Sequence, residues 1–206
     1  MIIVSIVKVK RADKCQVQFD NGDFFVCSMD IVLKYKLSKG FDIDDELLNE
    51  LIKEQRIIEV KQSAYNYASY KPRTTQQVIK KLKSKLFSNQ EMELAITFLN
   101  KFNMLDDESY CNKYIKDYLK KKPAGPKKIY YELLQKGIDK DTSQKSIDKY
   151  YPFSAIEEIA LKAIEKKLKR TSKITAENKK QKISAYLFQE GFDSSTIKKV
   201  IEEYFG

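Results

Sequence analysis

The apolar positions of this chain change their period at about residue 60. Before that point, β-branched and aromatic residues form short runs at 2–10 and 15–28, which predict strands. Two short helices are expected next, within residues 29–37 and 42–60. Beyond residue 60 the apolar residues recur every three or four positions, which is the period of amphipathic helices. We therefore expect a mainly helical protein with a small α+β module at residues 1–60.

The dipeptide Asn21-Gly22 predicts a β-hairpin in this first module. Both residues tolerate positive φ, so the pair favours a two-residue turn between antiparallel strands. Such a turn would set Val17 opposite Val26 and Phe19 opposite Phe24. Both pairs are apolar and would share one face of the hairpin.

The helical part contains an internal repeat. Ile129 lies 51 residues after Val78, and Ile183 lies 54 residues after Ile129, with a leucine four residues beyond each. The later columns of this alignment are Leu86, Gly137 and Gly191, then Phe87, Ile138 and Phe192, then Ser88, Asp139 and Asp193, then Ile96, Ile147 and Ile201, and finally Leu99, Tyr150 and Tyr204. The spacing predicts three tandem three-helix repeats, at 61–105, 106–152 and 153–206. Stacked repeats of this kind form an elongated, curved body.

Residues 105–138 have the pattern of a complete helix-loop-helix. Acidic residues suit the start of its first helix, and a lysine run followed by Gly-Pro separates the two helices. The residues expected to hold this motif together are Leu105, Asp106, Asp107, Glu108, Tyr110, Gly125, Pro126, Ile129, Leu133 and Gly137. Neighbouring residues on a helix point about 100° apart, so Asp106 and Asp107 are expected to cap the helix rather than to bind a metal or catalyse a reaction.

This ordered set of residues resembles the central signature of the RecX family, bacterial regulators of the RecA recombinase. With the flanking repeats the resemblance covers residues 63–206, and more loosely the N-terminal module. The family usually has Gly where this chain has Asn103, but Asn also tolerates the left-handed conformation, so a helix end is still expected there. The resemblance implies three tandem three-helix repeats that lie along the groove of a RecA filament on single-stranded DNA.

Composition excludes several classes of chemistry. The 206 residues include 3 cysteines and no histidine, so histidine-dependent catalysis and the common zinc sites are nearly excluded. The cysteines are expected to be reduced structural thiols, because the protein is expected in the cytoplasm and their number is odd. The predicted hairpin register also keeps Cys15 and Cys27 out of direct opposition, which argues against a disulfide between them. No apolar run is long enough for a membrane span or a signal peptide. We expect a soluble, cytoplasmic monomer without a metal, a cofactor or enzymatic activity.

Charge points to the kind of partner. The chain has 39 basic and 29 acidic residues; residues 1–62 hold 10 and 11 of them, so residues 63–206 hold 29 and 18. This excess favours a polyanion or an acidic protein surface, while a plainly solvated lysine surface is the alternative. Adjacent Tyr130 and Tyr131 cannot both face the core, so one of them is also a candidate for contact. The candidate contact residues are Lys80, Lys81, Lys85, Lys121, Lys122, Lys127, Lys128, Tyr131, Lys167, Arg170, Lys179 and Lys180.

Together these observations indicate a regulator without catalytic activity. As the resemblance implies, it would bind the RecA–single-stranded DNA filament and modulate ATP hydrolysis, filament growth and strand exchange, in recombination, DNA repair and the SOS response; inhibition is the expected direction, although the sequence itself does not give the sign. Two alternatives stay open. One is a basic helical protein that binds nucleic acid directly, and the other is a helical adaptor for another acidic protein.

Overall fold

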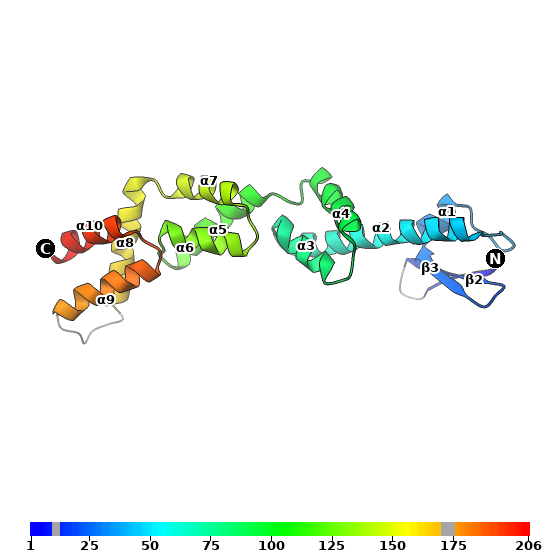
Figure 1. Ribbon diagram of the computed structural model, residues 1–206, viewed down its shortest axis with the longest axis horizontal. Coiled ribbons are helices and arrows are strands. Elements are labelled where there is room, and N and C mark those ends of the chain that lie inside the picture. Colours follow the sequence, from blue (N-terminus) through cyan, green and yellow to red (C-terminus); the bar gives the residue numbers. More distant parts are fainter. Residues whose placement is uncertain (10–12, 170–175) are drawn as a thin grey trace. The chain divides into compact units, whose positions relative to one another are not determined.

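The computed structural model describes residues 1–9, 13–169 and 176–206, with only the backbone of residues 153, 154 and 176–178. The elements in the described residues are β1 (Ile3–Lys8), β2 (Lys14–Phe19), β3 (Phe24–Ser28), α1 (Met29–Lys34), α2 (Asp45–Tyr70), α3 (Thr75–Lys83), α4 (Asn89–Lys101), α5 (Asp107–Lys121), α6 (Pro126–Gln135), α7 (Lys140–Tyr150), α8 (Phe153–Leu168), α9 (Ala176–Gln189) and α10 (Ser194–Phe205). The predicted fold class, mainly helical with a small N-terminal sheet, is confirmed (Figure 1).

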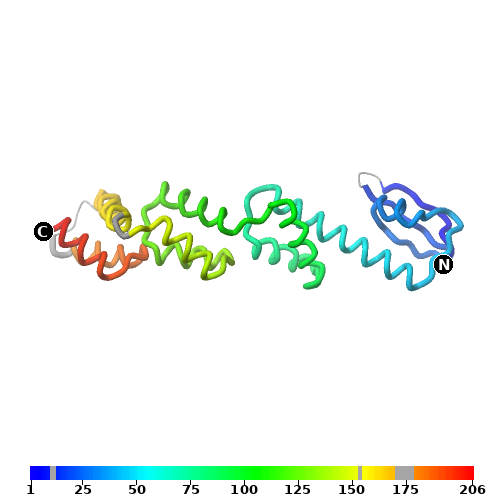
Figure 2. The backbone as a smooth tube through the Cα atoms, turned by 90° about the horizontal axis from the view of Figure 1, so that it is seen from above, coloured from blue at the N-terminus to red at the C-terminus, as the bar shows by residue number. Residues whose placement is uncertain are grey.

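The chain divides into two compact units. The first contains Met1–Lys71 and Ile79–Met104, and the second contains Pro72–Val78 and Leu105–Gly206. The backbone trace follows the chain from the sheet through α1 and α2 at the N-terminal end to α10 at the C-terminus (Figure 2). The first turn of α3 therefore belongs to the second unit, although the rest of α3 belongs to the first.

The predicted hairpin is present, but its predicted register is wrong by one residue. Gly22 has a φ of 88° and donates its N–H to Phe19 O at 3.2 Å, and Phe19 N–H donates to Asp23 O at 2.9 Å. The turn therefore contains three residues instead of the predicted two, and its last residue is a left-handed glycine. Val17 lies opposite Phe25 rather than Val26, and Phe24 is exposed.

The same register places Cys15 directly opposite Cys27, which corrects the expectation that they would lie out of opposition. Both cysteines, and also Cys111, are buried and free. Burial raises the pKa of the Cys27 and Cys111 thiols to about 11. These two thiols are therefore protonated near neutral pH and act as small apolar side chains.

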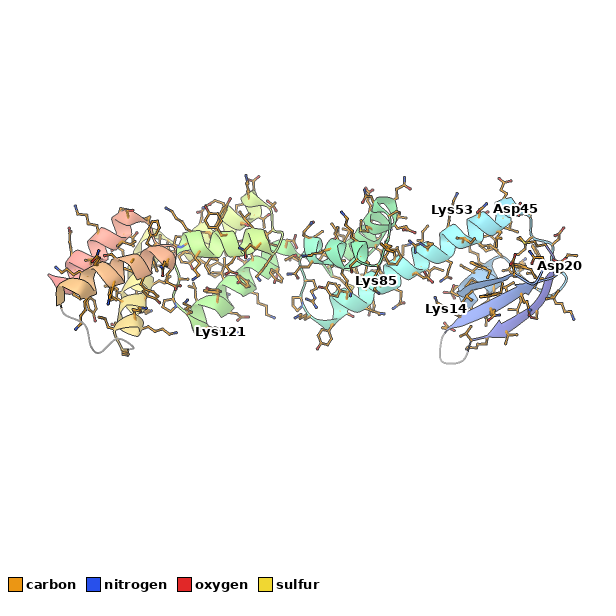
Figure 3. All side chains as sticks on the ribbon, turned by 60° about the horizontal axis from the view of Figure 1, so that its bottom comes forward. Lys14, Asp20, Asp45, Lys53, Lys85 and Lys121 are labelled. Atoms are coloured by element: carbon orange, nitrogen blue, oxygen red, sulfur yellow. The ribbon has the colours of Figure 1, made fainter. Side chains whose placement is uncertain are left out.

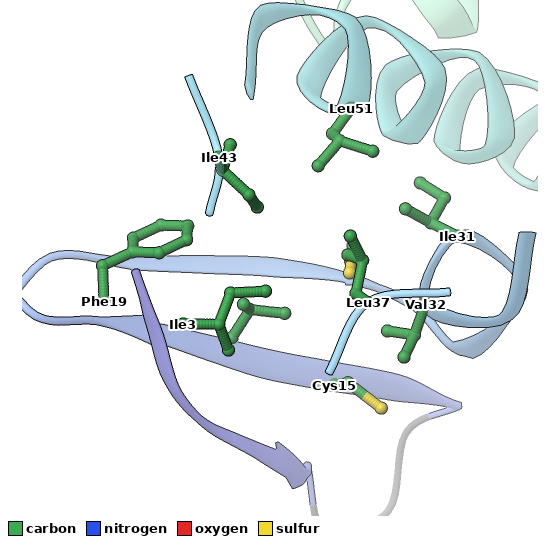
Figure 4. Close-up of a cluster of buried hydrophobic side chains, with 10 residues drawn as sticks. Ile3, Cys15, Phe19, Ile31, Val32, Leu37, Ile43 and Leu51 are labelled. Carbon is green, nitrogen blue, oxygen red and sulfur yellow. The ribbon is translucent and has the colours of Figure 1, made fainter. Parts of the chain in front are cut away.

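The three-stranded sheet buries one face beneath α1 and the first half of α2 (Figure 4). The strands pair antiparallel in the order β1-β2-β3. Side chains from the sheet, from α1 and from the loop before α2 meet in one apolar core. Its members with at most 1% exposure include Ile3, Val17, Ile31, Ile43 and Leu51. Gln55 on α2 joins this core to the sheet, because its side-chain oxygen accepts a hydrogen bond from Ser28 N–H at 2.8 Å.

Helix α2 is one uninterrupted helix of 26 residues. The expectation of a helix that ends near residue 60 is wrong, and the predicted domain boundary between residues 60 and 61 falls inside α2. The helix continues because its buried stripe continues through Val60, Ala64 and Ala68, and α4 packs against it. The small alanines allow a close approach of the two helices. Helix α2 thus serves both the N-terminal module and the first repeat, and the division into four domains stays a prediction.

The turn that follows the middle helix of each repeat has the same backbone geometry. Its left-handed residues, which we call the corner residues, are Leu86, Gly137 and Gly191, with φ angles of 61°, 82° and 88°. The N–H of the next residue returns to a carbonyl in the last helical turn, from Phe87 to Leu82, from Ile138 to Leu133 and from Phe192 to Leu187. These bonds define a Schellman motif in each repeat. The predicted column of helix-end residues is confirmed.

The capping residues of the last helix of each repeat are also confirmed. The side chains of Ser88, Asp139 and Asp193 accept hydrogen bonds from backbone N–H groups at Glu91, Thr142 and Thr196. The apolar column predicted at Ile96, Ile147 and Ile201 is only partly buried, because Ile96 and Ile201 are half-buried. The fully buried column lies one residue earlier, at Ala95, Ser146 and Val200.

Acid should weaken the cap of α10 through Asp193. Hydrogen bonds from the Ser195 hydroxyl and from Thr196 lower the pKa of this carboxyl from 3.8 to about 2. Because the folded pKa lies below the unfolded value, the stabilisation is present above about pH 4 and is lost as the pH falls towards 2.

Asp193→Asn should therefore flatten the dependence of the unfolding free energy on pH between about 4 and 2. Urea denaturation across this range checks the effect, with exposed Asp117→Asn as the control; equal slopes in the two variants would contradict it.

Candidate nucleic-acid interface

The candidate lysines of the first repeat lie on α3 and in the turn after it. Lys80 and Lys81 are exposed on the second half of α3. Lys85 is exposed as well, and its ammonium donates a hydrogen bond to Ser63 Oγ on α2 at 2.8 Å (Figure 3). Lys80 and Lys81 therefore present charge to solvent, whereas Lys85 also ties the turn to α2.

The four candidate lysines of the second repeat divide into two pairs. Lys121, at the C-terminal end of α5, and Lys127, on the first turn of α6, are exposed (Figure 3 labels Lys121). Lys122 and Lys128 instead form ion pairs with Glu190, at 2.8 and 3.0 Å. The Glu190 side chain is only 6% exposed, and it raises the pKa of Lys122 through their hydrogen bond. This second pair therefore neutralises a buried carboxylate, and only Lys121 and Lys127 are available for an external anion.

Glu190 is part of a tight contact between the second and third repeats. Gly125 N–H donates to Glu190 O at 2.7 Å, and Lys127 N–H donates to Gly191 O at 3.2 Å. A Cβ on Gly191 would lie 2.3 Å from Lys128 N, and a Cβ on Gly125 would lie 2.4 Å from the Gly191 carbonyl. Both glycines are thus required by the close approach of two backbones, in addition to the left-handed φ of Gly191.

A related contact, made by side chains instead of backbone N–H groups, occurs one repeat earlier. The Thr74 hydroxyl, at the start of α3, donates to Lys136 O at 2.7 Å, and a Cβ on Gly137 would lie 2.3 Å from Gln76 Cβ. Thr74 and Gly125 are 51 residues apart, as are the other equivalent positions of these repeats. In the first repeat the corner residue Leu86 is 87% exposed, and its carbonyl accepts a hydrogen bond from Arg56 at 3.1 Å. A side chain is tolerated at that corner because no backbone lies against it.

The candidates of the third repeat lie on α8 and α9. Lys167 Nζ lies 4.8 Å from the centre of the Tyr186 ring, a cation–π contact between the two helices. Lys180 is exposed, and Lys179 is half-buried. Arg170 lies outside the described residues.

Tyr131 is the exposed member of the tyrosine pair. Its side chain is 63% exposed, whereas Tyr130 is half-buried and packs against the core of the second repeat. The two rings meet edge to face with their centres 5.8 Å apart. Tyr131 thus keeps an open ring face on α6, close in sequence to Lys127.

Most of the signature residues lie at caps, turns or core positions of the second repeat. Leu105 is half-buried, Asp106 caps α5, Asp107 accepts a hydrogen bond from Thr75 N–H at 2.9 Å, Glu108 is exposed, Tyr110 stacks on Tyr114, Pro126 begins α6, and Ile129 and Leu133 are fully buried. Asn103 has a φ of 51°, as expected for a helix end. Among the described residues, no cluster of three or more acidic or cysteine side chains is placed to bind a metal ion.

Sequence reasoning missed the role of Glu190. The sequence does contain a sign of this role. The residue before the corner is basic in the first two repeats, Lys85 and Lys136, but acidic in the third, Glu190. A lone acidic residue among equivalent lysines indicates a specific partner. That partner is the pair Lys122 and Lys128.

Removing both partners of Glu190 should destabilise the second unit. Lys122→Gln with Lys128→Gln leaves a buried carboxylate without an ion pair, which we expect to cost about 1–3 kcal/mol, since the lysines themselves are partly exposed. Lys121→Gln with Lys127→Gln removes the same charge from the surface and should change the unfolding free energy by less than about 0.5 kcal/mol. Chemical denaturation measures both. Adding Glu190→Gln to the first variant should restore part of the loss, and equal stability of the two double variants would contradict the assignment.

The fold and the charge define a class of protein. After the small N-terminal sheet, the chain forms three three-helix repeats, built by α2–α4, α5–α7 and α8–α10. Each repeat has exposed lysines. No helix in the described part of the chain is both long and apolar enough to span a bilayer. The class is a basic helical-repeat protein with an N-terminal α+β module.

Family models identify the particular family. The first, second and third three-helix domains of RecX match residues 61–99, 106–147 and 155–201. The chain belongs to the RecX family. These domains coincide with the repeats built by α2–α4, α5–α7 and α8–α10.

Curated relatives support the assignment across nearly the whole chain. A regulatory protein RecX from Clostridium acetobutylicum is 31% identical over 95% of this chain and 92% of its own length. Another, from Finegoldia magna, is 30% identical over 99% of this chain and all of its own length. These proteins are named as regulatory proteins.

Solved structures support the fold. The crystal structure of a regulatory protein RecX superposes with a TM-score of 0.76 over 98% of both chains, at 23% identity. RecX from Lactobacillus salivarius superposes with a TM-score of 0.65 at 28% identity, over 72% of this chain and 96% of its own.

Proposed function

We propose that this protein regulates the RecA recombinase by binding to the RecA–single-stranded DNA filament, and that it inhibits ATP hydrolysis, filament growth and strand exchange. Membership in the RecX family supports RecA as the partner. The regulator acts by contact alone, without a catalytic group of its own.

The exposed lysines of the helical repeats carry the proposal. Lys80 and Lys81 on the first repeat, Lys121 and Lys127 on the second, and Lys180 on the third are all exposed. A long polyanionic partner can engage several such sites at once, so that individually weak contacts add up to stable binding. Tyr131 supplies an exposed aromatic ring beside the basic residues of the second repeat, which suits stacking on an unpaired base.

The direct test follows ATP hydrolysis by the cognate recombinase on single-stranded DNA as this protein is added. We expect hydrolysis to fall. Lys121→Gln with Lys127→Gln should require more protein for the same inhibition, whereas Lys145→Gln with Lys149→Gln, which removes the same charge from exposed positions of α7, should act like the parent. Unchanged hydrolysis at saturating protein would refute the proposal.

Salt dependence separates contacts to DNA from contacts to protein. Each phosphate contact to single-stranded DNA contributes a slope of roughly −0.7 to log K against log salt, so loss of Lys121 and Lys127 should flatten the slope by about 1.4 if both touch phosphate. A contact with a recombinase carboxylate would lower the filament affinity with little change in binding to bare DNA. Tight binding to bare DNA without any effect on the recombinase would instead favour a plain nucleic-acid-binding protein.

A further inference from the structure

The second half of α2 and the second half of α4 form a surface of the first repeat that lacks acidic residues. Residues 60–71 and 94–104 contain three lysines and no aspartate or glutamate, although the whole chain has 29 acidic residues. The two helices pack against each other (Figure 1). Arg56 pairs with Glu91 at 2.8 Å, and Lys61 on the next turns of α2 reaches Phe98 on the next turns of α4. The surface that follows on both helices therefore carries only positive charge.

Aromatic side chains cover this surface. The Lys61 ammonium lies 5.9 Å from the centre of the Phe98 ring, and Phe102 meets Phe98 edge to face with the ring centres 5.1 Å apart. Tyr65, one helical turn after Lys61, and Leu94, one turn before Phe98, are both exposed. We call the rings of Tyr65, Phe98 and Phe102 the aromatic face.

The equivalent positions on α7 and α10 are charged. Leu94 and Phe98 correspond in the second and third repeats to exposed Lys145, Lys149, Lys199 and Glu203. Charged residues are typical of the solvated side of a helix. Exposed apolar side chains at these positions of α4 contribute little to folding, because much of their surface stays in water. They are therefore not a general feature of the repeat, and their grouping indicates a partner for this helix.

We propose that the aromatic face binds single-stranded nucleic acid by stacking on its bases. Every base has a flat π surface that an exposed Tyr or Phe ring can cover. Lys61 and Lys101 supply ammonium groups for the phosphates on either side of a stacked base, and no carboxylate of these two segments repels those phosphates. An apolar groove on a protein would also fit the rings, but it would not account for the absence of acidic residues. The inference rests on the proposed function and deepens it, because it adds a base-contact surface for single-stranded DNA to the exposed lysines.

The first test uses a single tryptophan as a local reporter, because the chain has none of its own. Phe102→Trp places an indole on the aromatic face. Its fluorescence should be quenched by a single-stranded oligothymidine, but not by an abasic oligonucleotide with the same number of phosphates. Phe24→Trp is the matched control, since Phe24 is 63% exposed, as Phe102 is, but lies in the N-terminal sheet. The control should respond to neither oligonucleotide, and an equal response of Phe102→Trp to both would overturn the proposal.

The second test removes the rings and measures affinity. Tyr65→Leu with Phe102→Leu keeps apolar side chains at both positions and should weaken binding to the oligothymidine at least about tenfold. The slope of log K against log salt should stay that of the parent, because no phosphate contact is lost. Fluorescence anisotropy across a range of salt concentrations measures both quantities, and circular dichroism controls for folding. An affinity equal to that of the parent would contradict base stacking.

The recombinase filament separates this proposal from the proposed function. If the double leucine variant binds the bare oligothymidine like the parent but no longer binds the filament, the aromatic face contacts protein, and the base-stacking proposal is overturned. If the parent leaves ATP hydrolysis by the recombinase unchanged, the proposed function fails. The quenching and affinity measurements use no recombinase, so they still decide whether the aromatic face binds bases.

Discussion

Replacing Gly191 with alanine should separate the second and third repeats at their contact. The new Cβ would lie 2.3 Å from Lys128 N and 2.9 Å from Lys128 Cα, where backbone atoms cannot yield without moving a whole helix. The left-handed φ adds strain of about 1–2 kcal/mol, and the clash adds an overpacking cost of about 1–3 kcal/mol. We expect a total loss of about 2–5 kcal/mol in the unfolding free energy. Hydrogen exchange should accelerate at the amides of Gly125 and Lys127, which donate to Glu190 O and Gly191 O.

Gly40 provides the matched control. It has a φ of 84°, close to that of Gly191, but a Cβ there would meet nothing within 4 Å. Gly40→Ala should therefore show only the strain of the left-handed conformation, about 1–2 kcal/mol. The difference between the two variants measures the docking contact. If Gly191→Ala costs no more than Gly40→Ala and leaves both amides protected, the close backbone approach does not require glycine.

Leu133→Ala should be the other large effect. This side chain is fully buried on α6 and belongs to the core of the second repeat with Cys111, Ile115 and Ile129. Truncation of such a leucine leaves a cavity that close-packed neighbours cannot fill, at a cost of about 2–5 kcal/mol. Equilibrium denaturation followed by circular dichroism measures the loss. The adjacent Leu134→Ala, at a half-buried position, should cost distinctly less, and an equal cost for both would show that the buried side of α6 is misassigned.

Local pattern was sufficient for much of the helical part. The 51- and 54-residue offsets placed the corner residues, the caps and the buried leucines correctly, because helix period, caps and left-handed turns depend on residues within a few positions of each other. The hairpin shows that local pattern does not predict the register of strand pairing. Asn21-Gly22 marked the turn, but a choice between two and three loop residues shifted every cross-strand pair, and that choice depends on how the strands pack rather than on the turn sequence alone.

The sequence by itself determined the repeats, their helix ends and the excess of positive charge on the helical part. Only the tertiary structure decided which lysines are open to a partner, because Lys128 meets Glu190 across 62 positions of the chain, and no local pattern reports such a contact. It also decided why Gly137 and Gly191 are glycines while Leu86 is not. Positive φ is common to all three corners, but only two of them have no room for a Cβ, Gly137 because the Gln76 side chain lies against it and Gly191 because the Lys128 backbone does.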